Sequence, residues 1–449
     1  MKIIITEPTD KSNTKSIGCF FIENTVRKAG YNIQYVDFAD LKNHTADVWL
    51  FSVHHVRDIF YLAKMPKLKG IKIGGGHVMN NPYPFLHFFD IICVGEGEKW
   101  ILKMLQSLDN PLAVEGTLTM KNIDKPIVKQ YINDISINEK YLNVSHSQGH
   151  SDAWYIETAR GCKSKCAYCE LGWTTPFREN NLGKVYNDID CISNSNNKKV
   201  NIFAPDDYSV GNYEKILDYI LEKKLQTNFG SMRIDRFKGD DKQKKNFLFR
   251  LGVDGLSERI RKIINKENSN ESITSLFKSL IENDFVMFKM FNIFSYSFET
   301  ERDFFEFENV IEIIKTIAKK QGKTIFLRLK FTPLIPNPLT PLQYFTPDYN
   351  IAMRKKIDTF FINQKYQRSN VVIINDGILA PYSYYSQTFI ARASFEQIKI
   401  SDLMNMKRFN FLSEKLAKET NCEHNKVVTH ISEDKRKKMF EIIKKRING

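Results

Sequence analysis

The sequence predicts an α/β protein in which a doubly wound parallel sheet precedes an open, partial barrel. Three observations support this fold class. Short apolar runs alternate with helix-length segments over residues 1–110, the same alternation returns over 151–345, and a polar connection at 111–150 separates the two regions. Strand–helix–strand crossovers are right-handed, so this rhythm builds parallel sheets with helices on both faces. Residues 346–449 are expected to form a mainly helical region that shapes a substrate pocket.

The first region contains five strand candidates, each followed by a turn or a helical pattern. They are KIIIT (2–6), NIQYVDF (32–38), DVWLFSV (47–53), IKIGGG (71–76) and DIICVGEGE (90–98). Loops that leave the carboxyl ends of such strands line the ligand crevice. Those loops carry Ser52, His54, His55, Gly74, Gly75, Gly76, His77, Gly95, Glu96 and Gly97. Glycine there permits close backbone approach to a large ligand, although it also serves ordinary turns.

The second region contains six strand candidates, which predict a partial (β/α)6 barrel with its chemistry at the carboxyl-terminal rim. They are AWYIETA (153–159), KVNIFAP (199–205), QTNFGSM (226–232), FRLGVDG (249–255), FVMFKMFNIF (285–294) and TIFLRLKF (324–331). One further strand candidate, VVIIND, lies at 371–376 in the carboxyl-terminal region.

Composition favours a cytoplasmic, soluble protein. Four of the seven cysteines are scattered singly, unlike a disulfide framework, and no apolar run is long enough for a signal sequence or a membrane span. The formal net charge of +14 permits an anionic partner such as nucleic acid. Much of that charge lies in KRKKMFEIIKKRING (435–449), whose spacing favours a terminal helix with a solvated basic face.

The stretch GCKSKCAYCELGW (161–173) brings together Cys162, Cys166 and Cys169. Three thiolates on one loop suit an iron–sulfur cluster, and a four-iron cubane held by three cysteines leaves one iron open to a small molecule. Structural zinc usually takes four ligands in two pairs, and no second pair is nearby in the sequence. Zinc and metal-free packing are the alternatives.

This C-x-x-x-C-x-x-C pattern, with Tyr168 before its last cysteine, resembles the signature of the radical S-adenosylmethionine (SAM) superfamily. The resemblance implies a [4Fe-4S] cluster, a SAM molecule on the open iron, reductive cleavage to a 5'-deoxyadenosyl radical, and an external electron donor such as flavodoxin or ferredoxin. Later segments resemble the family in the same order: APDDYS (204–209), MRID (232–235), GVDGLSERIRK (252–262) and FSYSFETERDF (294–304).

The resemblance also implies roles for individual residues around SAM. Asp206 or Asp207 would lie near its amino group, and Arg233 would lie near its carboxylate, which suits a guanidinium fork. The remaining implied contacts are Tyr168, Gly252, Asp254 and Ser257. Relatives commonly have Glu where this chain has Asp254, which gives the contact a shorter reach.

The first domain, with GGGH (74–77) and VGEGE (94–98), resembles the radical SAM subfamily that carries an amino-terminal cobalamin-binding domain, as does PLIPNPLTPLQYF (333–345). The implied cobalamin contacts are Ser52, His54, Gly74, Gly75, Gly76, His77, Gly95 and Glu96. One departure is the absence of D-x-H-x-x-G after the first strand, where TEPTDKSN contains no histidine. Cobalamin would then bind without that lower ligand, or the domain keeps the fold without the cofactor.

The resemblance implies a cobalamin-dependent methyltransferase that acts on an unactivated carbon or on phosphorus. A rearrangement, or another radical reaction with or without cobalamin, is the alternative. Methylthiotransferases need a second cluster on three amino-terminal cysteines, where this chain has only Cys19 and Cys93. A non-catalytic, basic iron–sulfur or zinc protein that binds nucleic acid is a third hypothesis. The sequence does not indicate the substrate, small molecule or peptide, nor a catalytic acid or base.

Overall fold

The computed structural model describes residues 1–10, 15–143, 152–228, 233–234, 248–367 and 369–448. Its amino-terminal unit is a six-stranded sheet in the order β2-β1-β3-β4-β5-β6, in which only β6 is antiparallel. The strands are β1 Lys2–Thr6, β2 Asn32–Tyr35, β3 Val48–Ser52, β4 Ile71–Gly75, β5 Ile91–Cys93 and β6 Thr117–Leu118. The order 2-1-3-4-5 is that of a doubly wound, flavodoxin-like fold. The predicted fold class of this unit is confirmed.

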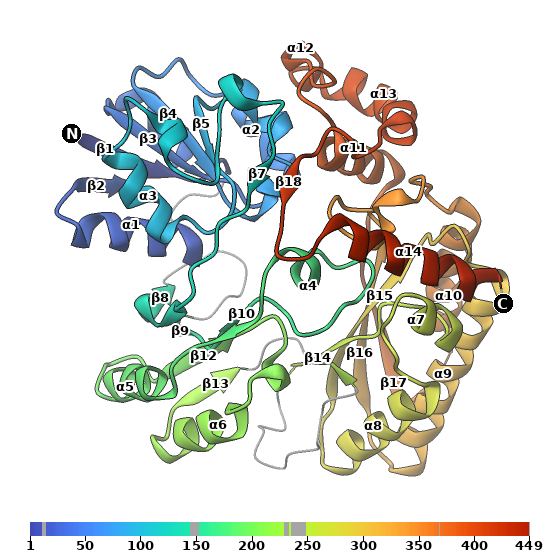
Figure 1. Ribbon diagram of the computed structural model, residues 1–449. Coiled ribbons are helices and arrows are strands. Elements are labelled where there is room, and N and C mark those ends of the chain that lie inside the picture. Colours follow the sequence, from blue (N-terminus) through green and yellow to red (C-terminus); the bar gives the residue numbers. More distant parts are fainter. Residues whose placement is uncertain (11–14, 144–151, 229–232, 235–247, 368, 449) are drawn as a thin grey trace.

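Helices cover both faces of this sheet (Figure 1). On one face, α1 (Ile17–Lys28) and α3 (Gly97–Leu105) bury an apolar stripe against alternate strand residues. Helix α1 begins after Ser16, whose side chain accepts a hydrogen bond from the Cys19 amide at 3.2 Å. On the other face lie α2 (Ile59–Leu62) and two short 3₁₀ segments.

The second unit contains all six predicted barrel strands. Strands β9 (Ala153–Glu157), β12 (Lys199–Phe203) and β13 (Gln226–Asn228) are parallel neighbours, and β8 (Tyr141–Asn143) joins β9 antiparallel. A second sheet has the order β14-β15-β16-β17 and is parallel throughout. Its strands are β14 Leu248–Gly252, β15 Met287–Phe294, β16 Ile325–Pro333 and β17 Val371–Ile378.

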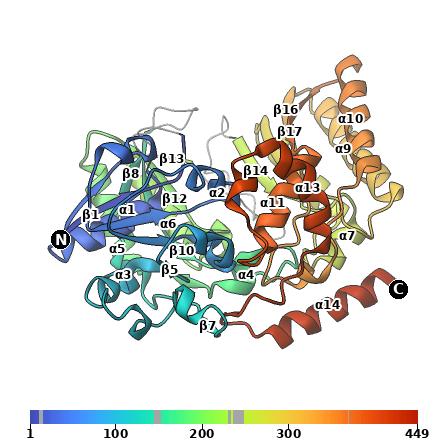
Figure 2. The same ribbon diagram turned by 90° about the horizontal axis from the view of Figure 1, so that it is seen from above.

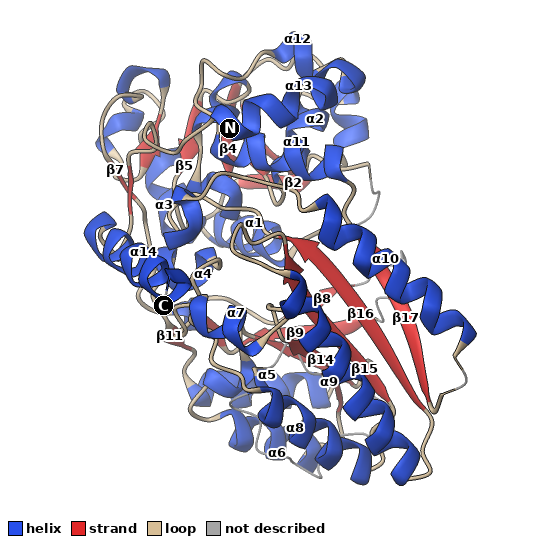
Figure 3. Cartoon of the chain, turned by 90° about the vertical axis from the view of Figure 1, so that its right-hand side faces the viewer, coloured by secondary structure: helices blue, strands red, loops and turns tan. Residues whose placement is uncertain are grey.

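Helices pack on the outer side of these strands (Figure 3). They are α5 Leu182–Ser193, α6 Tyr213–Glu222, α7 Glu258–Ile263, α8 Asn270–Glu282, α9 Glu301–Lys320 and α10 Ile351–Tyr366. In α9 the buried residues recur every three or four positions, from Phe304 and Phe307 to Ile311 and Ile314, which gives the helix one apolar face.

The regions at 111–150 and 346–449 are tied into both units. Besides β6 and β8, the first of them forms β7 (Ile127–Val128), which pairs in parallel with β18 (Val427–Val428). Strand β17 extends the barrel sheet beyond residue 345. The helices of the carboxyl-terminal region after β17 are α11 Pro381–Arg392, α12 Ile400–Leu403, α13 Met406–Glu419 and α14 Glu433–Asn448.

Seen from above, α11 and α13 lie beside α2, and α14 runs along a separate edge of the molecule (Figure 2). The ring of Phe409 on α13 meets that of Phe60 on α2 edge-on, with centroids 5.3 Å apart. Helix α14 confirms the predicted terminal helix, and it buries Arg436 and Ile443. Among the described helices, none combines the length and apolar character needed to cross a membrane.

Candidate cofactor sites

The three cysteines lie on the loop between β10 (Ala159–Arg160) and α4 (Glu170–Thr174), directly after the first barrel strand. Two glycines allow this loop its shape. Gly161 has φ +75°, and a Cβ there would lie 2.2 Å from the Pro176 carbonyl oxygen, whereas a Cβ on Gly172 would lie 2.1 Å from the Ser164 carbonyl oxygen. Any larger residue at either position would push the loop apart.

Hydrogen bonds fix the loop on both sides. The Trp173 indole donates to the Cys166 carbonyl at 2.9 Å, and the Ala167 amide donates to the Ile264 carbonyl at 2.8 Å. Burial raises the pKa of the Cys166 thiol, although the positive charges of Lys266 and Arg233 act to lower it. Burial likewise raises the pKa of Cys169 to about 12.

The donor set fits an iron–sulfur cluster. Iron binds thiolate and displaces the thiol proton, so ligation removes the protons that burial otherwise retains. Arg233 Nη1 donates to Cys166 Sγ at 3.1 Å, a contact that favours the thiolate form. Within the described residues, no three His, Cys, Asp or Glu side chains converge on a single-ion site. A cubane needs no such convergence, because its three cysteines bind three different irons.

A cavity of about 310 Å³ opens beside Arg233 at the carboxyl ends of β14, β15 and β16. It brings together three of the residues predicted around SAM, Arg233, Gly252 and Asp254. The other lining residues are Pro205, Lys266, Phe291, Asn292, Ile293 and Thr332. This is the rim at which barrel enzymes carry out their chemistry.

Asp254 links this cavity to the cysteine loop. Its carboxylate accepts a hydrogen bond from the Tyr168 hydroxyl at 2.7 Å and pairs with Lys266, and its carbonyl accepts from Tyr296 at 2.8 Å. Burial and the charge of Asp254 both raise the pKa of Tyr168, so the phenol stays protonated and donates. The residue before the last cysteine is therefore anchored in the cavity wall.

The other residues predicted around SAM lie outside the lining of this cavity. The Asp206 carboxylate accepts a hydrogen bond from the Ser209 hydroxyl at 2.5 Å, and the neighbouring Asp207 is fully buried. Ser257 caps α7, accepting from the Ile260 amide at 3.1 Å. Of the MRID segment, residues 232 and 235 lie outside the described residues.

A second cavity of about 370 Å³ lies between the carboxyl edge of the amino-terminal sheet and the barrel unit. Seven of the eight residues predicted to contact cobalamin line it: Ser52, Gly74, Gly75, Gly76, His77, Gly95 and Glu96. Its interior is apolar and includes Phe21, Leu50 and Trp100. Leu171 and Thr175, which lie just beyond the cysteines, form part of the opposite wall.

The chain's own packing already accounts for three of these glycines. A Cβ on Gly74 would lie 2.2 Å from the Phe89 ring. Gly76 and Gly95 have φ of +120° and +125°, and a Cβ on either would come within 2.3 Å of a backbone carbonyl oxygen. Their presence after the strands therefore reflects the fold itself, and they cannot be taken as ligand contacts on that ground.

The predicted histidines lie around a smaller neighbouring cavity of about 160 Å³, which shares His77 with the larger one. His54 Nε2 lies 3.0 Å from Glu7 Oε1 and 3.2 Å from Ser52 Oγ. Burial disfavours its charged form, but the hydrogen bond and charge of Glu7 raise the pKa of His54. Burial and the neighbouring His54 lower the pKa of His77 to about 4, so His77 is neutral. His55 caps a 3₁₀ turn through the Arg57 amide.

A charged network closes one side of the larger cavity. Arg160 Nη1 lies 2.8 Å from Glu98 and 3.4 Å from Glu96, and its Nε donates to Glu157 at 2.7 Å. Arg178 grips Glu96 through both terminal nitrogens, at 2.7 and 2.8 Å. Burial opposes ionisation, but Arg178 and Arg160 together lower the pKa of Glu96. The predicted contact Glu96 thus holds the two units together.

A second polar connection crosses the cavity wall to the cysteine loop. Lys129 Nζ donates to Asn80 Oδ1 at 2.6 Å, and Asn80 Nδ2 donates to the carboxylate of Glu170, the residue after Cys169. Burial lowers the pKa of Lys129 to about 8. The larger cavity and the cysteine loop are therefore joined by direct hydrogen bonds.

Solved structures with a similar fold include two radical SAM enzymes. The methyltransferase TsrM from Kitasatospora setae, with cobalamin and a [4Fe-4S] cluster bound, matches with a TM-score of 0.53 and 11% identity over 74% of this chain and 75% of that one. The cobalamin-dependent radical SAM enzyme OxsB with aqua-cobalamin bound matches with a TM-score of 0.57 and 12% identity over 100% of this chain and 80% of that one. The chain has the fold of cobalamin-dependent radical SAM enzymes.

This likeness confirms the fold expected from the sequence resemblance. By sequence, the chain is 24% identical over 372 residues to an uncharacterized protein of Methanocaldococcus jannaschii, covering 79% of this chain and 77% of the relative. No protein-family model matches the chain.

Two of the residues that line the cavity beside Arg233 and that the sequence did not single out have a charged or amide side chain, Lys266 and Asn292. Lys266 follows α7 in a polar stretch with no motif, so only the fold brings it to Asp254. Asn292 could have been recognised from the sequence, because it is a polar residue at one of the alternate positions of β15 whose side chains are buried, between Met290 and Phe294. It is 1% exposed, and its amide has no hydrogen-bond partner among the described residues. A buried amide facing a cavity is a candidate ligand contact.

Proposed function

We propose that the protein is a cobalamin-dependent radical SAM enzyme, most specifically a methyltransferase that acts on an unactivated carbon or on phosphorus. One observation carries the proposal. The cysteine loop lies between two cavities. It reaches the cavity of about 310 Å³ beside Arg233 through Tyr168 and Asp254, and Leu171 and Thr175, just beyond the loop, line the cavity of about 370 Å³. A cluster held on this loop would face both.

Each cavity offers groups that suit its proposed occupant. Beside the cluster, Arg233 would bind the SAM carboxylate, and Asn292 supplies an unused amide donor and acceptor. The larger cavity offers an apolar interior for a flat ring and a polar rim for the amides of a corrin. The likeness to TsrM and OxsB, whose structures contain cobalamin, supports the same assignment.

The cluster and SAM would together supply a carbon radical, and cobalamin would supply the methyl group. The chain's part is to hold these groups in line and to keep water out. Tyr168 and Lys266 orient Asp254, and the arginine–glutamate network closes the cavity between the units. We also propose an external one-electron donor such as flavodoxin or ferredoxin, and a cytoplasmic setting. A radical rearrangement is the second candidate, because the same cofactors would serve it.

The test is metal content after anaerobic reconstitution with iron, sulfide and hydroxocobalamin, followed by desalting. We expect about four irons and about one cobalt per chain, and release of 5'-deoxyadenosine from SAM after reduction. Cys166→Ala should abolish that release, whereas Cys191→Ala, an exposed cysteine outside the loop, should leave it unchanged. Iron without cobalt would overturn the cobalamin assignment. Equal release by both variants would overturn the radical SAM assignment.

A further inference from the structure

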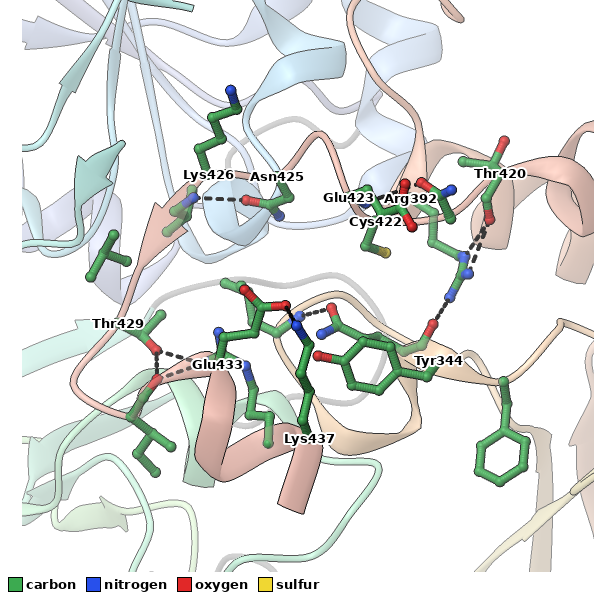
Figure 4. Close-up of a pocket in the computed structure, with 18 of the residues that line it drawn as sticks. Tyr344, Arg392, Thr420, Cys422, Glu423, Asn425, Lys426, Thr429, Glu433 and Lys437 are labelled. Atoms are coloured by element: carbon green, nitrogen blue, oxygen red, sulfur yellow. Dashed lines mark hydrogen bonds and ion pairs between the residues drawn. The ribbon is translucent and has the colours of Figure 1, made fainter. Parts of the chain in front are cut away.

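A further cavity lies away from both proposed cofactor sites. It measures about 590 Å³ and is enclosed by residues 339–346, by helix α14, and by the segment 420–432 between α13 and α14, here called the strap (Figure 4). None of its lining residues belongs to either cofactor cavity. Its volume is in the range of small-molecule sites.

Two buried guanidiniums form part of this wall. Arg392 is 3% exposed, and its three donor nitrogens bind carbonyl oxygens of Thr420, Pro336 and Gln343 at 2.8 to 3.1 Å. Arg436 is 4% exposed, and its Nη1 donates to Thr429 Oγ1 and to a carbonyl of the strap. These bonds satisfy donors without neutralising the positive charges.

No carboxylate of the described residues pairs with either guanidinium. Three acids lie in the wall. Glu433 pairs with Lys437 at 2.8 Å, and although burial lowers the pKa of Arg436, the charge of Glu433 acts more weakly to raise it. Glu419 lies 3.8 Å from Lys415, and Glu423 is exposed. Buried charges are normally paired, because desolvating an uncompensated ion is costly. Glu433, which is shared with Lys437, offsets only part of the charge of Arg436, so the remaining positive charge beside the cavity favours a negative charge within it.

Arg436 also has a donor to spare. Its Nε is buried and has no hydrogen-bond partner among the described residues. A buried, unused N–H on a charged group beside an open cavity suits a charge-assisted hydrogen bond to an oxyanion. Lys437 adds a further cationic side chain to the wall, whereas the ammonium of Lys426 points away from the cavity and donates to the Asp124 carbonyl at 3.1 Å (Figure 4).

We propose that this cavity binds a small organic anion, a carboxylate or a phosphate ester, which accepts a hydrogen bond from Arg436 and neutralises the two guanidiniums. The site goes beyond the proposed enzyme function, since it uses none of the cofactor residues. It nevertheless touches the cysteine loop indirectly. Arg436 holds Thr429, whose hydroxyl lies 3.4 Å from the Trp173 carbonyl, and the Trp173 indole binds the Cys166 carbonyl. A bound anion would therefore stabilise the contact between Thr429 of the strap and Trp173 of α4.

The test is titration calorimetry of the reconstituted protein with citrate and, separately, with inorganic phosphate at low ionic strength. We expect saturable binding of at least one probe at one site per chain. Binding of citrate alone would identify a carboxylate site, and binding of phosphate alone a phosphate site. Arg436→Gln should weaken the affinity at least tenfold, because it removes a buried charge and its donor.

Two further variants make the result decisive. Lys444→Gln is the matched control, since it removes one positive charge from the same helix at an exposed ion pair with Glu441 outside the cavity, and it should leave the affinity unchanged. Lys437→Gln should weaken binding severalfold, because it leaves the Glu433 carboxylate unpaired beside the anion. This exposed variant decides the question if Arg436→Gln fails to fold by circular dichroism.

Absence of saturable binding by both probes would overturn the proposal. So would an equal loss of affinity in Lys444→Gln and the cavity variants, since that indicates general charge attraction. Neither result depends on SAM cleavage or cobalt content, so this inference and the proposed function fail separately.

Discussion

Replacing Arg160 with Met should destabilise the protein strongly, because three carboxylates converge on this guanidinium. Its nitrogens lie 2.7 Å from Glu157, 2.8 Å from Glu98 and 3.4 Å from Glu96. The side chain of Arg160 is 17% exposed, and those of Glu98 and Glu157 are 5% and 6% exposed. Removing one partner of a buried ion pair costs about 3–5 kcal/mol. Glu96 retains Arg178 as a partner, so the cost of removing Arg160 should come chiefly from Glu98 and Glu157.

The assay is urea unfolding followed by tryptophan fluorescence, with Arg27→Met as control. Arg27 also pairs with a buried glutamate, Glu23, but its own side chain is 57% exposed and Glu23 keeps Lys15 as a second partner, so its removal should cost less than about 1 kcal/mol. A loss for Arg160→Met no larger than that of the control would refute the reasoning.

The effect of Arg160→Met should also depend on pH. Asn138 Nδ2 bridges Glu98 and Glu157 at 3.2 and 3.1 Å, so without Arg160 these two buried carboxylates face one another. Two buried carboxylates this close repel one another while both are charged, and a proton taken up by either relieves the repulsion. Because low pH favours that proton, the destabilisation should be smaller at about pH 5 than at about pH 8. Equal losses at both values would contradict this account.

Three further outcomes are expected. Gly76→Ala should destabilise the fold by more than about 1 kcal/mol, because Gly76 has a φ of +120°, which residues with a side chain rarely adopt. Gly18→Ala is the control: the position is helical and has open space for a Cβ, so the change should stabilise the fold slightly. Thermal unfolding of the two variants makes the comparison. Tyr168→Phe should leave the fold intact but weaken SAM binding in equilibrium dialysis severalfold, because Asp254 loses a hydrogen bond. Burial opposes ionisation of Glu96, but Arg178 and Arg160 hold its pKa below the usual 4.5. In an acid titration of stability, the contribution of Glu96 should therefore be lost as pH falls below that usual value.

The strands were the most predictable part of the fold. Their signal is local: apolar runs such as KIIIT and the alternation in β15 persist whatever surrounds them. The pairing of β7 with β18 was not predictable, because it joins two-residue strands about three hundred positions apart. The same holds for β17, whose strand character was readable but whose place beside β16 depends on the whole sheet.

The candidate sites divide in the same way. The cysteine spacing is a local pattern, and Arg233, Gly252 and Asp254 follow strands whose carboxyl ends must meet. Lys266 could not be found, since only tertiary packing brings it to Asp254. For the glycines, a local pattern had more than one explanation. The sequence suggested that Gly74 and Gly76 contact a ligand, but close packing against Phe89 and Val53 already requires glycine at both positions.

Helix α4 explains why the cysteine loop depends on parts of the chain that carry no motif. The Tyr131 hydroxyl, from the connection between the units, donates to the Thr174 carbonyl at 2.7 Å, and Thr429 of the strap reaches the Trp173 carbonyl. Asn80, from the amino-terminal unit, binds Glu170 at the start of the helix. Three distant segments therefore fix five residues that are too few to form a stable helix alone. The position of the cysteines between the two cavities is consequently a property of the assembled chain, even though the three cysteines lie within eight consecutive positions.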